Sequence, residues 1–136
     1  MASIEELRSA RIAKIEKLKA SGMNPYPSFL LRDCSIRDVK NSFDSFAPAS
    51  ETTPISIAGR VMVVRGQGKI LFIVIQDGKD RLQAVLKKDV LPEDVFSLFV
   101  DTVDNGDFIS VTGSLFTTDR GEQSILIQSW QMGTKA

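Results

Sequence analysis

The stretch GRVMVVRGQGKILFIVIQDGKDRLQAVL, residues 59–86, decides the fold of this chain. It contains three apolar runs, which are separated first by Gly66 and Gly68 and then by the sequence Asp77-Gly78-Lys79-Asp80. Apolar residues recur at every second position within the runs, as they do in a β-strand that buries one face. The glycines and the Asp-Gly sequence favour tight turns. The stretch therefore predicts three antiparallel strands joined by hairpins.

The same period assigns the two faces of these strands. The positions predicted to point into the protein interior are Ile57, Val61, Val63, Leu71, Ile73, Ile75, Leu82, Ala84 and Leu86. Alternation then sends Ile70, Phe72 and Val74 outward on the second strand, with Arg81 and Gln83 beside them on the third. Arg65 ends the first strand, where alternation does not decide its direction.

The segment after the third strand changes its period. Pro92 followed by two acidic residues is typical of the start of a helix, and Val95, Leu98 and Phe99 would form its buried face. Alternation resumes over residues 108–116, where Ile109, Val111 and Leu115 share a face.

A turn over residues 117–121 leads to a last strand at 122–130, which gives the order β-β-β-α-β-β. We therefore predict a mostly β protein with a five-stranded OB-fold, a Greek-key barrel with a helix between strands 3 and 4. A sandwich or another barrel stays open, although little chain is left for a second sheet.

The first residues predict a helix that precedes the barrel. Ser3 and Glu6 fit a capping box, apolar residues recur on one face over residues 4–20, and Gly22 and Pro25 would end the helix. Basic residues interrupt the apolar face, so we expect this helix to lie against a surface instead of filling a core.

Residues 38–46 could form a short helix, and residues 47–54, APASETTP, are predicted to be a linker. We therefore divide the chain into residues 1–54, with the N-terminal helix, a proline-rich segment and a linker packing on the barrel, and residues 55–136, the barrel.

The composition is that of an ordinary globular domain, with 136 residues, 43% apolar and 25% charged. There is no histidine, and Cys34 is the single cysteine. Zinc sites, histidine acid/base chemistry and internal disulfides are therefore not expected, and Cys34 is interpreted as structural. No apolar run approaches the length of a membrane span, and the first residues lack a secretory signal, so we expect a cytoplasmic protein without a membrane partner.

The net charge is zero, but the charges are unevenly distributed. Residues 60–88 hold seven basic and two acidic residues, whereas residues 89–107 hold six acidic residues and no basic one. A neutral chain of this kind can still present a basic face to a polyanion. The alternative is solvated charge at two ends of a domain.

Phe72 is the residue that most favours nucleic-acid binding. An exposed aromatic ring among arginine, lysine and glutamine gives an unpaired base a stacking platform, while the amide can bond a pyrimidine edge and the cations can meet phosphates. The alternative is structural, because residues 70–75 are apolar on both faces and the N-terminal helix could cover the ring. Trp130 is interpreted as a core residue, residues 66–69 as a hairpin turn, and no group of residues supports catalysis.

Three segments resemble one known family: LRSARIAKIEKLKASGMNPYP (7–27), SIAGRVMVVRGQGKILFIVIQDGKDRLQAVL (56–86) and VDNGDFISVTGSLFTTDRGEQSILI (103–127). Together they resemble the N-terminal anticodon-binding domain of bacterial-type class II lysyl-tRNA synthetases, over nearly the whole chain. The resemblance implies that the barrel holds the anticodon loop of a lysine tRNA and reads its uridine-rich bases.

The resemblance also implies roles for single residues. Phe72 corresponds to the aromatic residue that stacks on a base, Arg65 and Gln83 to residues that contact the central anticodon base, and Glu122 to one that reads a neighbouring base. Candidate contacts to the tRNA backbone are Lys69, Arg81, Arg60 and Arg120. Asp119 stands where the family usually has a basic residue and Gln123 where leucine is usual, which implies an altered grip of the last hairpin.

The family's catalytic domain, with its ATP, magnesium and lysine sites, would follow Ala136, so the resemblance implies no cofactor and no aminoacylation for this chain alone. The parent would be a homodimeric lysine–tRNA ligase, and the isolated domain a monomer. Three alternatives stay open: a sequence-tolerant single-strand binder, a free-standing interaction domain, and a designed or stabilised scaffold based on this domain.

Overall fold

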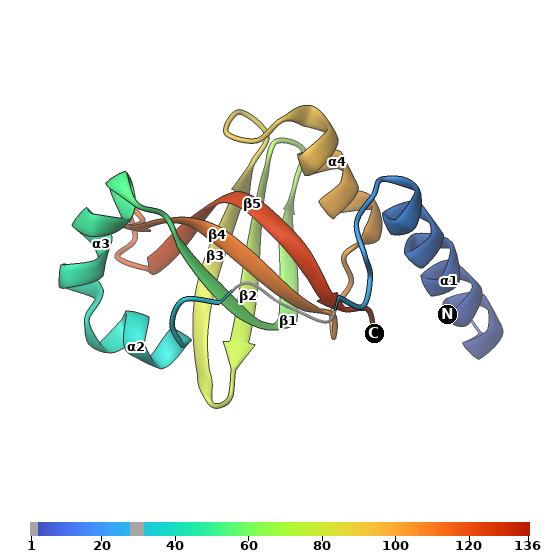
Figure 1. Ribbon diagram of the computed structural model, residues 1–136, viewed down its shortest axis with the longest axis horizontal. Helices are drawn as coiled ribbons and strands as arrows, with labels where there is room; N and C mark the ends of the chain where they lie inside the picture. The colour runs from blue at the N-terminus through green and yellow to red at the C-terminus, as the bar shows by residue number, and fades with distance from the viewer. Residues whose placement is uncertain (1–2, 28–31) are drawn as a thin grey trace.

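The computed structural model describes residues 3–27 and 32–136, and its centre is a closed barrel with the strand order β1-β2-β3-β5-β4 (Figure 1). The elements in chain order are α1 (Ile4–Ala20), α2 (Ile36–Asn41), α3 (Phe43–Thr52), β1 (Ile55–Gln67), β2 (Ile70–Asp77), β3 (Asp80–Lys87), α4 (Glu93–Thr102), β4 (Phe108–Thr117) and β5 (Gln123–Thr134). Neighbouring strands are antiparallel except β3 and β5, which are parallel. With α4 between β3 and β4, the predicted OB-fold is confirmed.

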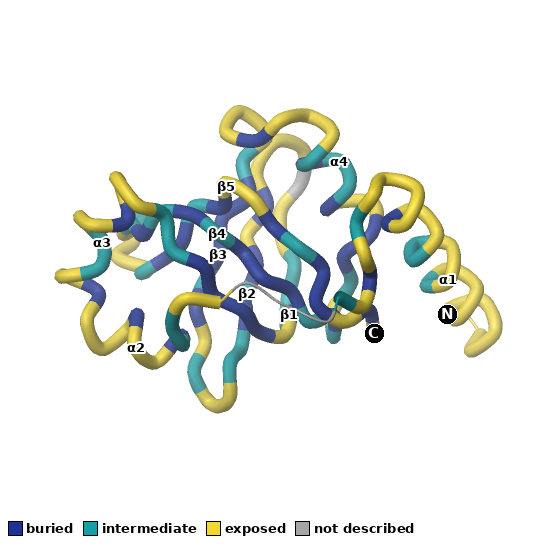
Figure 2. The backbone as a smooth tube through the Cα atoms, viewed as in Figure 1, coloured by how far each residue is buried: buried dark blue, intermediate teal, exposed yellow. Residues whose placement is uncertain are grey.

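Alternate residues of the strands fill the barrel, as the sequence pattern predicts. Every inward position predicted on β2, β3 and β4 is at most 8% exposed: Leu71, Ile73, Ile75, Leu82, Ala84, Leu86, Ile109, Val111 and Leu115. Figure 2 shows buried residues concentrated on the strands, whereas α1 is exposed along most of its length. Burial of this continuous apolar interior is the main driving force for the fold.

The strand β1 departs from strict alternation near its middle. Val61 pairs with Ile75, but Val63 pairs with the adjacent residue Val74, so β1 carries one extra residue between these pairs. Such a β-bulge moves every later side chain of the strand to the opposite face. Val64 therefore packs against the core, and our prediction that Val63 points inward is wrong.

The N-terminal helix α1 begins with the predicted capping box. The Ser3 hydroxyl accepts from the Glu6 amide at 3.1 Å, and the Glu6 carboxylate accepts from the Ser3 amide at 3.3 Å. Leu18 is the one residue of α1 that is fully buried. The helix therefore lies against a surface, mainly that of α4, instead of filling a core, as we predicted.

The helix α1 lies beside α4 (Figure 1), and ion pairs attach it to the end of α4 and the loop after it. The ammonium group of Lys14 lies 2.5 Å from the Asp104 carboxylate, and that of Lys17 lies 2.5 Å from the Asp101 carboxylate. Two lysines of α1 thus meet part of the acidic segment 89–107.

The linker predicted at residues 47–54 is wrong, because α3 continues to Thr52 with Pro48 inside it. The reason is a tertiary contact of the buried Ser50. Its hydroxyl donates to the Ala47 carbonyl at 2.7 Å and accepts from the Leu115 amide of β4 at 2.8 Å. The helix predicted at 38–46 is found as α2 and α3, which meet at Ser42. The domain division at residue 54 stays a prediction.

The helix α4 buries a face slightly different from the predicted one. Phe99 is 1% exposed as expected, but Phe96 at 5% replaces Val95 and Leu98, which are half-buried. The indole of Trp130 on β5 explains this orientation, because its ring meets Phe99 edge-on at 5.2 Å and its N–H donates to the Val95 carbonyl at 3.1 Å. Trp130 is therefore a core residue, as predicted.

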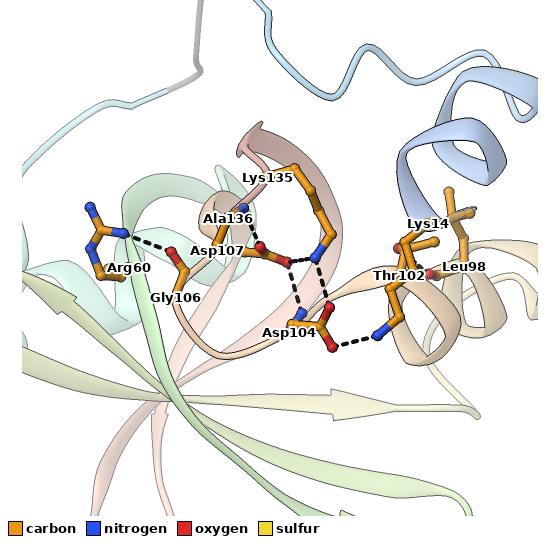
Figure 3. Close-up of polar contacts among 9 residues, drawn as sticks. All are labelled: Lys14, Arg60, Leu98, Thr102, Asp104, Gly106, Asp107, Lys135 and Ala136. Atoms are coloured by element: carbon orange, nitrogen blue, oxygen red, sulfur yellow. Dashed lines mark hydrogen bonds and ion pairs between the residues drawn. The ribbon is translucent and has the colours of Figure 1, made fainter. Parts of the chain in front are cut away.

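A buried ion pair joins the end of β5 to the loop before β4 (Figure 3). The Lys135 ammonium lies 2.7 Å from the Asp107 carboxylate and 2.8 Å from that of Asp104, and the side chains of Lys135 and Asp107 are both 0% exposed. Asp107 also accepts from the amides of Asp104 and Ala136, each at 2.7 Å. These bonds compensate for the cost of burying the charges.

Two lysines also determine the ionisation of Asp104. Burial alone would raise the pKa of this carboxyl, but hydrogen bonds from Lys135 and Lys14 outweigh burial and hold the pKa below its ordinary value. Through Asp104, the end of β5 is therefore linked electrostatically to α1.

Candidate nucleic-acid interface

The ring of Phe72 stands on the outer face of β2. It is 37% exposed, and the next outward residue, Ile70, is 40% exposed. The alternative in which the N-terminal helix covers Phe72 is therefore wrong, since α1 packs beside α4 instead. The bulge in β1 makes Arg65 the direct cross-strand partner of Phe72, and such partners share a face of the sheet.

A groove of about 800 Å³ lies over this face. Its walls are the outer side of β1, β2 and β3 and the turn between β4 and β5, and we refer to it as the Phe72 groove. The residues that line it are Arg65, Ile70, Phe72, Gln83, Val85, Lys87, Phe116, Thr117, Thr118, Asp119, Arg120 and Glu122. The fold thus brings together all four residues to which the resemblance gives base contacts, although their roles stay predictions.

Gln83 is held from the side of β5. It is the register partner of Ser124 in the parallel β3–β5 pair, and its amide N–H donates to the Ser124 hydroxyl at 3.0 Å. The Ser124 hydroxyl in turn donates to the backbone carbonyl of Glu122 at 3.2 Å. Two of the predicted site residues are therefore connected through one serine.

The turn after β4 orients Glu122 at the rim of the groove. The Thr118 hydroxyl accepts from the Glu122 amide at 3.0 Å, and the Thr118 amide donates to the Glu122 carbonyl at 2.9 Å. Gly121 makes the reversal at a φ of +85°, a conformation that costs glycine little. Arg120 and Asp119 lie at the tip of the turn, so both face any ligand in the groove.

Phe116, Lys87 and Val85 are among the lining residues that were not selected from the sequence. Phe116 adds a second aromatic ring, Lys87 adds a cation, and Val85 contributes apolar surface although it is only 1% exposed. Strand alternation could have identified Val85 and Phe116, which lie one position from the inward residues Leu86 and Leu115. Val85 of β3 and Phe116 of β4 line one groove only because the barrel closes, which no local pattern encodes.

The candidate backbone contacts are spread over more of the surface. Arg120 lines the groove, and Lys69 is exposed in the turn between β1 and β2. Arg81 donates from Nε to the Gln76 side chain at 2.8 Å, and Arg60 donates to the Gly106 carbonyl at 2.7 Å (Figure 3). Neither Arg81 nor Arg60 lines the groove.

The charges of the groove suit a polyanion that carries exposed bases. Arg65, Lys87 and Arg120 supply cations, against two carboxylates, those of Asp119 and Glu122. Cations can contact phosphates, whereas carboxylates can accept only from donor groups such as base amines and imino N–H groups. The combination of ring, cations and acceptors allows stacking, backbone contact and base-edge hydrogen bonding in one place.

Outside the groove, Cys34 shows no sign of an activated thiol. It is half-buried, and burial together with Asp33 and Asp38 raises its pKa, which keeps the thiol protonated. Within residues 3–27 and 32–136, no three Cys, Asp or Glu side chains gather in a way that could hold a metal ion. In that part of the chain, none of the helices has the length and hydropathy needed to cross a membrane.

Residues 55–132 match the tRNA anti-codon family, which is described as an OB-fold nucleic acid binding domain. The chain belongs to this family of OB-fold domains. It is 34% identical over 134 residues to the lysine–tRNA ligase of Thermosipho africanus, covering 97% of this chain and 27% of that protein. It is also 34% identical over 127 residues to lysine–tRNA ligase 2 of Methanosarcina mazei, covering 93% and 25%.

A third relative, the lysine–tRNA ligase of Thermotoga maritima, is 31% identical over 135 residues, with 98% of this chain and 27% of that protein covered. The resemblance to lysyl-tRNA synthetases is therefore confirmed over most of the chain, which spans about a quarter of the length of these relatives.

Proposed function

We propose that this chain binds the anticodon loop of a lysine tRNA in the Phe72 groove. The observation that most supports the proposal is the exposed ring of Phe72, with Arg65 directly opposite it and Gln83 on the neighbouring strand. A base unstacked from the loop can lie on this ring, while its edge meets the amide and the guanidinium. Membership in the OB-fold family and the similarity to lysine–tRNA ligases agree with this assignment.

Within this proposal, Phe72 stacks on a base, Arg65 and Gln83 contact the central anticodon base, and Glu122 reads a neighbouring one. Contacts to the tRNA backbone come first from Arg120, which lines the groove, and from the exposed Lys69. Arg81 and Arg60 come second, since each already donates to a protein acceptor.

We further propose that the chain is the anticodon-binding part of a cytoplasmic, homodimeric lysine–tRNA ligase. Aminoacylation, with its ATP, magnesium and lysine, would then take place in the part of such an enzyme that this chain does not match. The chain alone would bind tRNA without acylating it. The alignment with about a quarter of each relative supports this division.

The test of tRNA binding is a titration of the chain with an RNA hairpin that carries the lysine anticodon UUU. Phe72→Ala should weaken binding by ~1–3 kcal/mol, the usual contribution of a base–aromatic stack. Tyr26→Ala is the matched control, because Tyr26 is 51% exposed and lies outside the groove. Equal affinities of the Phe72→Ala variant and the wild type, with both folded by circular dichroism, would contradict the proposal.

A second candidate function is sequence-tolerant binding of single-stranded RNA. It is favoured by the acidic Asp119 at the tip of the turn and by the fact that stacking accepts any base. Hairpins with unrelated anticodons distinguish the two functions. Equal affinity for all loops would favour the tolerant binder, and no affinity for any loop would favour a protein-interaction role.

A further inference from the structure

Ser124 links the two parts of the Phe72 groove from a fully buried position on β5. The residue is 0% exposed, and its hydroxyl makes both of the hydrogen bonds that connect Gln83 with the backbone of Glu122. Gln83 itself is only half-buried and lines the groove. A buried hydroxyl therefore touches the inner end of a side chain whose outer end faces the groove.

The chemistry of a hydroxyl determines which end of the Gln83 amide it can meet. Serine has a single O–H donor, and here that hydrogen is directed to the Glu122 carbonyl. Only the lone pairs of Oγ remain for Gln83, so the amide must present its NH₂ group, as it does at 3.0 Å. A reversed amide could bond Ser124 only if the hydroxyl turned its hydrogen to Gln83 and gave up its bond to the Glu122 carbonyl. The serine thus favours one of the two orientations of the amide.

The other end of the amide is available to a ligand. With Nε2 bonded to Ser124, the carbonyl oxygen Oε1 is the other polar atom of the planar amide, and no group of the described chain donates to it. A bound base can therefore find an acceptor at this position, held by the protein before binding. Preorganised polar groups of this kind give more discrimination than mobile ones.

We infer that Ser124 is a positioning residue that makes the groove select uracil over cytosine at the base read by Gln83. This inference rests on the proposed function. Uracil carries a hydrogen on N3 and can donate it to Oε1, whereas the N3 of cytosine carries only a lone pair that would face the same oxygen. A freely rotating glutamine could instead offer its NH₂ group to cytosine, because an amide can both donate and accept.

The test compares two RNA hairpins that differ only at the central anticodon base, UUU and UCU. The wild-type chain should bind the UUU hairpin about tenfold more tightly, as expected for one buried hydrogen bond gained or lost. Ser124→Ala should reduce this ratio to about two- to threefold, mainly by improving the binding of UCU. Ser124→Thr retains the hydroxyl and should restore the ratio.

Two further variants separate positioning from a general structural role. Ser56→Ala removes another buried hydroxyl, which contacts Thr112 at 2.6 Å outside the groove, and should leave the ratio unchanged. In a Gln83→Ala background, Ser124→Ala should have no additional effect on the ratio, because a residue that acts through Gln83 is not additive with it.

Several outcomes would overturn the inference. The inference fails if Ser124→Ala binds the UUU and UCU hairpins with the same ratio of affinities as the wild type. It also fails if Ser124→Ala weakens binding to both hairpins equally. Full additivity of Ser124→Ala and Gln83→Ala would show that the serine acts elsewhere. If the wild type binds neither hairpin, the proposed function fails, and this result is distinct from binding without discrimination.

Discussion

Arg65 and Phe72 are cross-strand partners because β1 contains one residue more than the strand it pairs with. The extra residue lies between Val61 and Val63, and it turns the end of β1 over so that Arg65 stands on the outer face beside the ring. Bulges are common where a strand has to redirect a functional side chain. The irregularity in β1 thus creates the pairing of cation and aromatic ring on which the proposed interface depends.

Arg65→Ala should therefore weaken RNA binding and reduce its dependence on salt. If Arg65 also contacts a phosphate beside the base that it reads, its loss should lower the slope of log K against log salt by about one unit. Affinity for the UUU hairpin should be titrated at several salt concentrations. Arg37→Ala is the matched control, since Arg37 pairs with Asp80 at 3.2 Å and lies outside the groove. An unchanged affinity and slope for Arg65→Ala would exclude Arg65 from the interface.

The barrel should also be sensitive to any side chain at Gly113. A Cβ atom at this position would overlap the backbone carbonyl of Leu126 on the neighbouring strand, which cannot move without breaking the β4–β5 pairing. Gly113→Ala should therefore cost ~3 kcal/mol or more, in the range of severe backbone and packing changes.

The comparison variant for Gly113→Ala is Gly121→Ala. A Cβ at Gly121 meets nothing within 4 Å, but the φ of +85° is unfavourable for alanine. The expected cost is ~1 kcal/mol from the left-handed conformation alone. Urea unfolding followed by circular dichroism measures both variants. A Gly113→Ala protein as stable as the wild type would contradict the tight approach of β4 and β5.

Strand alternation predicted the order of the elements and the exposure of Phe72, because the period-two pattern is local and the core enforces it. It failed at Val63, where one additional residue in β1 reverses the alternation and no turn or proline marks the change. The same bulge decides the direction of Arg65, which alternation left open.

The missed helix over residues 47–52 has a different cause. Pro48 and the small polar residues around it favour a linker locally, but the contact of Ser50 with Leu115 on β4 stabilises the helix. Likewise, no local pattern marks Ser124 as the partner of Gln83, and this contact appears only when β3 and β5 pair across the closed barrel. Local patterns cannot encode contacts that depend on closure.

The stability of the chain should fall in acid through Asp104. The folded-state pKa of this carboxyl lies below its ordinary value, so its contribution is fully present above the unfolded-state pKa of about 4 and is lost as the pH falls through the folded-state pKa. Urea unfolding between pH 7 and pH 2 should show this decline. Asp104→Asn should be less stable at pH 7 and show a shallower decline below about pH 4. If the wild type and Asp104→Asn lose stability with the same slope below about pH 4, other carboxylates cause the loss of stability in acid.

The buried pair of Lys135 and Asp107 should contribute far more to folding than the exposed pair of Lys17 and Asp101. Lys135→Ala leaves the Asp107 carboxylate buried without its cation, which typically costs ~3–5 kcal/mol. Lys17→Ala breaks a pair whose side chains are 53% and 44% exposed and should cost ~0–1 kcal/mol. Urea unfolding at pH 7 measures the loss of unfolding free energy in each of the two variants. Equal losses would mean that water reaches Asp107 when Lys135 is removed, so that the carboxylate is resolvated instead of left unpaired.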